Sequence, residues 1–583
     1  MKKMLLFFAV AGIIPSAFAA NHLIWKSANH EGWFNEQANW SNSEFFETGG
    51  ADNFFRFSTA ESNGGDYTLY MSDYAMQGAL HAYIWKTSTL VFDGAGAVFE
   101  LPASESGAVV NNTGYDPFTI RSDGYNIGVA YLSAANTTSA AFCFTNIYMK
   151  IGRTATDGRL TWDLIRGYFS FAEPGGTNTA HTFNLAAYSG KGNDLRMDVA
   201  FSNVTVRLPQ FNFRCYPSNN SFTVSSGICD IMGALSFDTT SALTYPGTNT
   251  FLVTEGAQVT QHSGAFNAEL TANAGVRFDQ FVVTGEGTRF SAAGASSVNF
   301  LGTSSLSVSD GAEAIMPADK IIAFGTASGD RPELVVSGTG TLFNARSSQR
   351  LELNIKTAVT VSDGAELRLP RSSWIGGKSS ADEVTFTVRD DGTQVTVMTN
   401  NTGLGGFYVG NQAGSKAVFN MEGGTFGGVT DQHSYSFYLG NPETSSGTVN
   451  LSGGTIHVGP VNSLYIGMTG NGTMNISGGE LYASTLINLG YRSPSTPQTS
   501  RYNQTGGYVY AKNGLYACAN SNTANRTADI VLDGGLLETT LIYGSKTQAA
   551  GGLGTGRFYA DGGRHTQSDH HPDHGGQSVH PLS

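Results

Sequence analysis

The sequence predicts an all-β protein, a right-handed parallel β-helix (solenoid) with an N-terminal cap. Three observations predict this fold: a glycine that recurs at nearly constant spacing, short runs of alternating residues between these glycines, and a composition rich in turn-forming residues. The 583 residues include 73 glycines, and 40% of the chain is hydrophobic whereas 14% is charged. A chain with this much apolar surface can bury a core, so global disorder is not expected.

The recurring glycine follows a short apolar run in each unit. Neighbouring members of this glycine ladder are 25 to 31 residues apart. The ladder consists of Gly227, Gly256, Gly285, Gly311, Gly338, Gly364, Gly392, Gly423, Gly453, Gly478, Gly506, Gly534 and Gly562. Such a period indicates one structural unit repeated along the chain.

Each unit contains alternating runs, such as Phe281 to Thr284 and Glu366 to Leu369, that are broken by Gly, Asn, Asp and Ser. Period-two alternation with turn residues between the runs predicts strands. A unit of about 27 residues with two or three strands cannot close a core by itself, so it must stack on its neighbours as one rung of a solenoid. A β-propeller blade is longer, at about 40 residues or more.

The ladder glycine is predicted to recur because each rung must turn sharply there, often through positive φ, where a Cβ is unfavourable. Gly453→Val is therefore expected to cost more stability than a change at the neighbouring polar positions.

The N-terminus has the three parts of a secretory signal peptide, predicted at residues 1–19. Lys2 and Lys3 precede an apolar stretch, and Ala17-Phe18-Ala19 offers a cleavage site between small residues. The alternative, an uncleaved anchor, is disfavoured because the apolar stretch is shorter than the roughly 20 residues of a spanning helix. No membrane-spanning helical segment is expected after cleavage.

The mature chain divides into segments that differ in composition and in the regularity of the repeat. Residues 20–75 are aromatic-rich and lack the period, which predicts an N-terminal cap over the open edge of the first rung. Residues 76–200 are predicted to form irregular early rungs, and residues 201–563 regular rungs of about 27 residues. Residues 564–583 form a His-rich tail outside the repeat, either a separate device or the product of a truncated or frameshifted reading frame.

The tail holds His565, His570, His571, His574 and His580. Histidine-rich tracts can bind Zn²⁺ or Ni²⁺, but without a fixed scaffold they bind loosely, and Pro572 disfavours a helix that would pair His570 with His574. No specific metal site and no cofactor are predicted.

The chain has four cysteines: Cys143, Cys215, Cys229 and Cys518. They are too few for disulfides to hold an exported chain of this length together. They are either buried free thiols or include a Cys215–Cys229 disulfide.

Two recurring motifs beyond residue 400 resemble those of bacterial surface proteins. Phe407 to Gly410, Phe437 to Gly440 and Leu464 to Gly467 alternate with Asn420 to Gly424, Asn450 to Gly454 and Asn475 to Gly479. These repeats resemble the autotransporter-associated β-strand repeats of autotransporter-type passengers, and Trp25, Trp33 and Trp40 resemble the opening of those chains. The resemblance implies export, a β-helical stalk, and an adhesive or structural role. The C-terminal barrel or sorting anchor of those proteins has no counterpart in this sequence.

The net charge of the chain limits the classes of partner that it is expected to bind. The formal charge of −13 and the lack of a basic run argue against nucleic acid and anionic membranes. Asp310, Asp363 and Asp391 precede ladder glycines, and Asp363 and Asp391 fall in neighbouring rungs with Arg389 nearby, as a polysaccharide lyase or glycosidase would require. Asp before Gly is more typical of turns, so no catalytic residue is predicted.

Two columns of side chains are predicted from the repeat. Asn420, Asn450, Asn475 and Asn503 each stand three residues before a Gly-Gly pair, so their amides are expected to form a hydrogen-bonded ladder. Tyr408, Tyr438 and Tyr465 share one register and are predicted to form an outward aromatic column, which would bind glycans or stiffen the stack by mutual packing.

The sequence thus predicts a non-catalytic adhesin or structural passenger, exported through the Sec pathway of a Gram-negative cell to the surface or medium, with glycans or surface polymers as partners. The alternative is a secreted carbohydrate-active β-helix. Fold alone does not separate the two.

Overall fold

The computed structural model describes strands between Asn21 and Gln567. Beyond Phe211 and two residues near the N-terminus, side chains are described for residues 221–236, 250–268, 280–326, 329–378, 383–397, 406–428, 435–459, 462–518, 525–543 and 557–560. The predicted signal peptide, the side chains of the predicted cap apart from two residues, the tail histidines, and the side chains of Cys143 and Cys215 lie outside the described residues.

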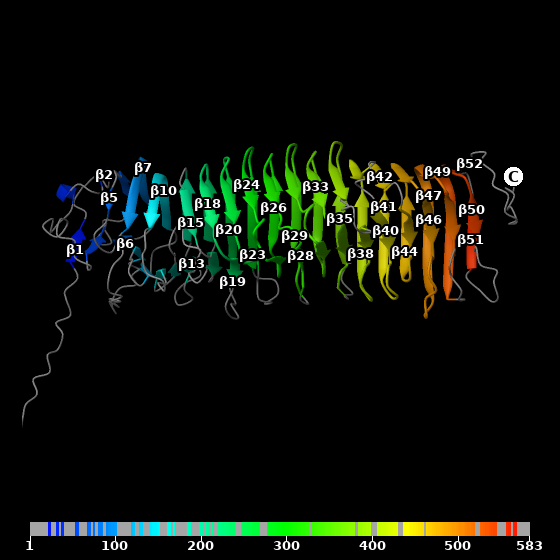
Figure 1. Cartoon of the computed structure of the whole chain (residues 1–583), viewed down its shortest axis with the longest axis horizontal. Coiled ribbons are helices and arrows are strands. Elements are labelled where there is room, and N and C mark those ends of the chain that lie inside the picture. Colours follow the sequence, from blue (N-terminus) through cyan, green and yellow to red (C-terminus); the bar gives the residue numbers. More distant parts are fainter. Residues whose placement is uncertain are drawn as a thin grey trace, which may run out of the picture.

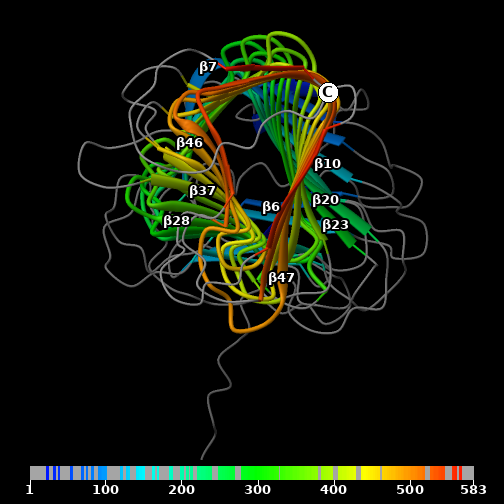
Figure 2. The ribbon, with the colours of Figure 1, turned by 90° about the vertical axis from the view of Figure 1, so that its right-hand side faces the viewer.

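The chain winds into a parallel β-solenoid with three walls along one long axis, which confirms the predicted fold class (Figure 1). Figure 2, turned so that one end of the rod faces the viewer, shows the strands of successive rungs lying behind one another in these walls. From β13 to β44, each strand pairs in parallel with the strand three places later in the chain, as β17 (Asn220–Ser225) does with β20 (Gly247–Thr254). This order means that every rung contributes one strand to each wall.

The further strands of the first wall are β14 (Met197–Ser202), β23 (Arg277–Thr284), β26 (Ser305–Ser309), β29 (Glu333–Ser337), β32 (Ala358–Ser362), β35 (Glu383–Val388), β38 (Lys416–Met421), β41 (Ser446–Leu451) and β44 (Asn471–Ile476). The second wall contains β15 (Thr205–Leu208), β18 (Ile228–Ile231), β21 (Gln258–Gln261), β24 (Arg289–Ser291), β27 (Glu313–Ile315), β30 (Leu342–Asn344), β33 (Glu366–Leu369), β36 (Gln394–Val397), β39 (Thr425–Gly427), β42 (Thr455–Val458) and β45 (Glu480–Ala483). The third wall contains β13 (Phe183–Ala187), β16 (Phe211–Arg214), β19 (Leu235–Asp238), β22 (Ala265–Ala268), β25 (Ser297–Phe300), β28 (Ile321–Phe324), β31 (Arg350–Leu353), β34 (Ser372–Ile375), β37 (Gly405–Val409), β40 (Tyr435–Leu439), β43 (Leu464–Ile466), β46 (Leu486–Leu489), β48 (Gly514–Ala517) and β50 (Ile542–Gly544).

Near the C-terminal end, two long strands pass from the first wall into the second without a break: β47 (Gln498–Ala511) and β49 (Arg526–Thr539). β51 (Thr555–Ala560) and β52 (Arg564–Gln567) then pair with the two halves of β49.

The N-terminal part is less regular. It contains β1 (Asn21–Ile24), β2 (Glu31–Trp33), the short 3-10 helix η1 (Gln37–Asn39), β3 (Asn53–Arg56), β4 (Tyr67–Tyr70), β5 (Tyr74–Ala75), β6 (Leu80–Ile84), β7 (Thr89–Leu101), β8 (Phe118–Ser122), β9 (Ile127–Tyr131), β10 (Ala140–Ile151), β11 (Leu160–Leu164) and β12 (Gly167–Phe169). Parallel pairing runs from β4 through β7 and β10 to β14, whereas β8, β11, β12 and β13 pair antiparallel. The boundaries of the cap and of the early rungs stay predictions.

The core follows from the alternation within each strand. Burial in β41, β44 and most other strands alternates residue by residue, so apolar side chains point inward and polar ones outward. One inward column in the first wall contains Phe222, Phe251, Phe281, Leu306, Leu334, Val359, Phe386, Phe419, Val449, Met474, Tyr502 and Ile530. Its members are 25 to 33 residues apart, close to the predicted rung length. Phe251 and Phe281 stack with their ring centroids 4.8 Å apart, which is about one rung spacing.

The turn between the first and second walls alternates between two forms over six rungs. The short form places two adjacent residues at positive φ, as in Asp310 and Gly311, whereas the long form has its positive-φ residues one position apart, as in Gly338 and Gly340, and ends on a buried threonine such as Thr341. The threonine Oγ1 accepts a hydrogen bond from the glycine N–H of the preceding short turn. This contact joins Gly256 to Thr288 (2.9 Å), Gly311 to Thr341 (2.9 Å) and Gly364 to Thr393 (3.1 Å). The structural repeat in this part is therefore two rungs, a feature that the single glycine period does not reveal.

From the rung that contains β38 onward, the ladder glycine has a different structural role. Earlier ladder members such as Gly256 (φ 79°) and Gly364 (φ 78°) do adopt positive φ. The prediction is wrong for Gly453, because the residue at positive φ there is the next glycine, Gly454 (φ 69°). Gly453 instead lies against the preceding rung, where an added Cβ would stand 2.3 Å from the carbonyl oxygen of Glu422.

Candidate functional site

The predicted tyrosines occupy one outward column of the third wall. Tyr408 is in register with Tyr438, and Tyr438 with Tyr465, on consecutive strands β37, β40 and β43. Their strand neighbours Leu464 and Ile466 are fully buried, whereas Tyr465 is half-buried, so the rings stand on the outer side of the wall. The three tyrosines thus stand in register on one wall.

The rings cover one another. Tyr408 and Tyr438 have centroids 4.7 Å apart and planes 9° apart, and for Tyr438 and Tyr465 the values are 5.0 Å and 6°. Parallel rings this close cannot lie side by side in one plane, so they stack with offset faces. Trp374 meets Tyr408 edge-on at one end of the column, and Tyr491 meets Tyr465 edge-on at the other.

This packing leaves mainly ring edges and phenol hydroxyls on the outside of the column. Burial raises the pKa of Tyr408 and that of Tyr465, as expected for phenols enclosed by neighbouring rings. A sugar ring stacks on the face of an aromatic ring, and both faces of Tyr438 are occupied. The geometry favours mutual packing for this column, and glycan binding by these three residues stays a prediction.

Small neighbours hold the column in place. Gly406, two residues before Tyr408, lies beneath its ring, and a Cβ there would stand 2.4 Å from the ring atom Cε2. Beyond the Trp374 end, the Arg350 guanidinium lies 3.9 Å from the Trp374 ring centroid and donates from Nε to Glu352 at 2.6 Å. This cation–π contact extends the ordered column by one rung.

The predicted asparagines form a ladder on the first wall. Asn450 Nδ2 donates to Asn420 Oδ1, Asn475 donates to Asn450, and Asn503 donates to Asn475, each at 2.9 Å. All four side chains are half-buried. Each amide thus links its rung to the preceding one, as an amide stack in a cross-β assembly does.

We expect Asn450→Ala to lower the free energy of unfolding by about 1 to 3 kcal/mol, because it removes one donated and one accepted hydrogen bond, each contributing about 0.5 to 1.5 kcal/mol. Asn503→Ala removes only the bond that it donates to Asn475, and its in-register partner in β49 is Val531, so about half that loss is expected. Urea unfolding followed by far-UV circular dichroism compares the two variants. Equal losses would show that the asparagines act singly.

The acidic residues of the turns make local hydrogen bonds. Asp310 Oδ2 accepts from Thr284 Oγ1 at 2.8 Å and from Ser309 Oγ at 2.9 Å, and these two bonds lower the pKa of Asp310. Asp363 Oδ2 accepts from Ser362, and the N–H of Asp363 donates to Asp390 Oδ2 at 3.3 Å. These contacts are those of turn residues.

The carboxylate that contacts Asp363 from the next rung is thus that of Asp390, and the sequence had suggested Asp391. Arg389 Nε lies 3.6 Å from Asp390 Oδ2, and both of these side chains are about half exposed. This group sits on an outer turn of the rod.

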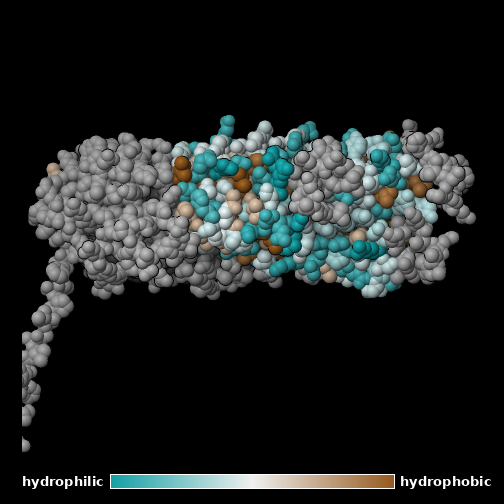
Figure 3. Space-filling model, in the orientation of Figure 1, coloured by the Kyte–Doolittle hydropathy of each residue, from teal (hydrophilic) through white to brown (hydrophobic). Residues whose placement is uncertain are grey.

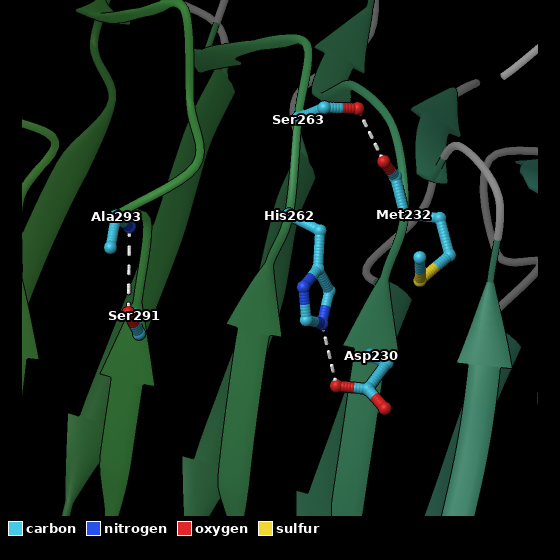
Figure 4. A network of polar contacts seen from close by, with 6 residues as sticks. All are labelled: Asp230, Met232, His262, Ser263, Ser291 and Ala293. Atoms are coloured by element: carbon cyan, nitrogen blue, oxygen red, sulfur yellow. Dashed lines mark hydrogen bonds and ion pairs between the residues drawn. The ribbon is translucent and has the colours of Figure 1, made fainter. Parts of the chain in front are cut away.

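One histidine is paired with a carboxylate on the second wall. His262 Nε2 lies 2.8 Å from Asp230 Oδ1 (Figure 4). The two serines nearby are bound elsewhere, because Ser263 Oγ donates to the Met232 carbonyl and Ser291 Oγ accepts the Ala293 N–H at 3.4 Å. Among the residues drawn in Figure 4, neither serine is hydrogen-bonded to His262.

A second aromatic group, which the sequence analysis did not single out, lies on the second wall toward the C-terminal end. His457, Tyr482 and Tyr510 share one outward column on β42, β45 and β47, and Glu480 and Tyr508 share the neighbouring column. The alternating runs Glu480 to Tyr482 and Tyr508 to Tyr510 carry the signal that could have revealed it, because both place aromatic residues at outward positions.

Comparison with known proteins yields no match: no protein-family profile, no curated protein and no solved structure matches the chain. The described residues contain no helix of the length and apolarity needed to cross a membrane. Within the same part of the chain, no three His, Cys, Asp or Glu side chains are grouped so that they could hold a metal ion. Cys229 is a buried free thiol, in agreement with the free-thiol alternative for this residue, and Cys518 is buried as well.

Proposed function

We propose that the protein is an exported, non-catalytic passenger that works at the cell surface or outside the cell as a structural or adhesive stalk. The observation that carries this proposal is the set of rung-to-rung columns that line the rod. Stacked tyrosines support the third wall, the asparagine ladder supports the first wall, and threonine-to-glycine bonds support the turns between the first and second walls.

Where they occur, these columns join a rung to its neighbour by contacts outside the hydrophobic core, and such contacts resist shear between rungs. In a solenoid each unit contacts only its neighbours, so the interfaces between units set the stability of the whole rod. The surface in Figure 3 is mainly hydrophilic over the described residues, with scattered apolar side chains, which suits a wall exposed to water. The leader-like residues 1–19 and the resemblance to autotransporter passengers support export.

The proposal is tested by expressing the full chain in a Gram-negative host and locating it by cell fractionation and protease treatment of intact cells. We expect the chain outside the inner membrane, with a mature N-terminus at Ala20 by terminal sequencing. A matched chain that lacks residues 2–19 should stay in the cytoplasm. Retention of the complete chain in the cytoplasm with residues 1–19 intact would overturn the proposal.

A further inference from the structure

The second-wall aromatic group is distinct from the tyrosine column in its surroundings. We define the Tyr482 patch as His457, Glu480, Tyr482, Tyr508, Tyr510 and Glu538. Its residues lie on four consecutive rungs, because Tyr482 is in register with His457 on one side and with Tyr510 on the other, and Tyr510 is in register with Glu538. All six side chains are partly or fully exposed.

The rings of the patch are arranged less tightly than those of the third wall. His457 stacks on Tyr482 with centroids 5.1 Å apart and planes 16° apart, and Tyr508 meets Tyr482 edge-on at 5.7 Å. Tyr510 makes no ring contact with another described residue. The Tyr510 ring therefore lies beside the stacked His457 and Tyr482 rings without being part of a closed stack.

Two carboxylates border these rings and accept hydrogen bonds from the phenol hydroxyls. Tyr482 donates to Glu480 Oε2 at 3.0 Å, and Tyr508 donates to Glu538 Oε2 at 2.7 Å. The hydrogen bond to Glu480 raises the pKa of Tyr482, and burial together with Glu538 raises the pKa of Tyr508 to about 12. Both phenols thus keep their protons at neutral pH, and those protons are directed at the carboxylates.

The result is a surface of hydrogen-bond acceptors beside aromatic rings. Each phenol oxygen retains lone pairs, and each carboxylate has an oxygen that the phenol does not use. A sugar ring offers the complementary groups, since its hydroxyls donate and its C–H face packs on an aromatic ring. The net charge of −13 and the two glutamates oppose an anionic polymer.

We propose that the Tyr482 patch is a binding site for a neutral glycan, with Tyr510 as the stacking platform and Glu480 and Glu538 as acceptors for sugar hydroxyls. This inference names a partner for the exported stalk. It rests on the proposed function only because an exported chain meets such polymers. Binding itself is independent of export and is tested with purified protein.

The test is affinity electrophoresis of the full chain in native gels that contain hydroxyethylcellulose, galactomannan, or a soluble mixed-linkage glucan, with alginate and glycol chitosan as the anionic and cationic probes. At least one neutral polymer should retard the wild type. Tyr510→Leu, which keeps apolar bulk but has no aromatic face, and Glu538→Gln should each weaken that retardation by about tenfold or more. Tyr559→Leu is the matched control, because Tyr559 is an exposed tyrosine on the first wall outside the patch, and this variant should retain the retardation.

Thermal melts establish that each variant is folded before its retardation is compared, and Tyr510→Phe, which keeps the ring, should bind like the wild type. The inference is overturned if no neutral polymer retards the chain, if glycol chitosan alone does so, or if Tyr510→Leu and Glu538→Gln bind as well as Tyr559→Leu. Release of reducing ends from a retarding polymer would contradict the non-catalytic function but leave the binding site standing, so the two failures are distinguishable.

Discussion

Gly453→Val should lower the free energy of unfolding by about 3 kcal/mol or more, because a Cβ at this position meets backbone that cannot move aside. The added atom would stand 2.3 Å from the carbonyl oxygen of Glu422 and 3.1 Å from its carbon, both in the preceding rung. Any adjustment must separate β38–β39 from β41–β42, where the asparagine ladder and the buried core also join the rungs. Urea unfolding monitored by far-UV circular dichroism measures the loss.

Two variants separate the causes of that loss. Ser452→Val changes the exposed residue beside Gly453 and should cost less than about 1 kcal/mol. Gly256→Val tests positive φ alone, since nothing lies within 4 Å of an added Cβ, and should cost about 1 to 2 kcal/mol. A loss for Ser452→Val as large as that for Gly453→Val would contradict the close approach of the two rungs.

Arg526→Met should also destabilise the rod by about 3 kcal/mol or more, because it removes the donor for three backbone carbonyls. Arg526 is fully buried, and its guanidinium donates to the carbonyls of Gly470 (2.9 Å), Thr469 (2.9 Å) and Arg492 (3.1 Å). Burial lowers the pKa of Arg526 to about 10, because the enclosed guanidinium is less hydrated than one in water. Methionine fills much of the volume but leaves the oxygens without a partner.

Arg501→Met is the matched control, since Arg501 is about half exposed and the buried carboxylate of Asp529, 3.7 Å away, keeps a closer partner in Arg557 at 2.9 Å. Its loss should stay within about 1 kcal/mol. Limited trypsin digestion gives a second readout, because Arg526 fixes the carbonyl at Arg492, and cleavage after Arg492 should accelerate in Arg526→Met. Unchanged stability together with unchanged cleavage would show that the buried guanidinium does not support the rod.

The columns were predictable because a parallel solenoid places equivalent positions of successive rungs directly over one another. Once the period was read from the glycines, Asn450 and Asn475 had to be neighbours, and so had Tyr438 and Tyr465. The same logic misjudged Gly453, because the pattern gives the position of a turn but not which of two adjacent glycines has positive φ.

The Tyr482 patch and Arg526 could not be found in this way. Tyr482 and Tyr508 lie in different columns, so no single register connects them, and their contact depends on how the rings turn across the wall. A charged residue in a sequence is expected at the surface, and Arg526 is buried only because backbone carbonyls of two earlier rungs converge on it.

The sequence by itself determined the period, the all-β class and the inward or outward side of residues in the regularly alternating strands, because these depend on local alternation and on turn chemistry. Only the tertiary structure decided how the outward rings pack, which glycine lies against the neighbouring rung, and where a guanidinium is enclosed. Those features depend on distances between residues about one or two rungs apart in the chain, which are set by the stacking of whole rungs and not by the residues next to them.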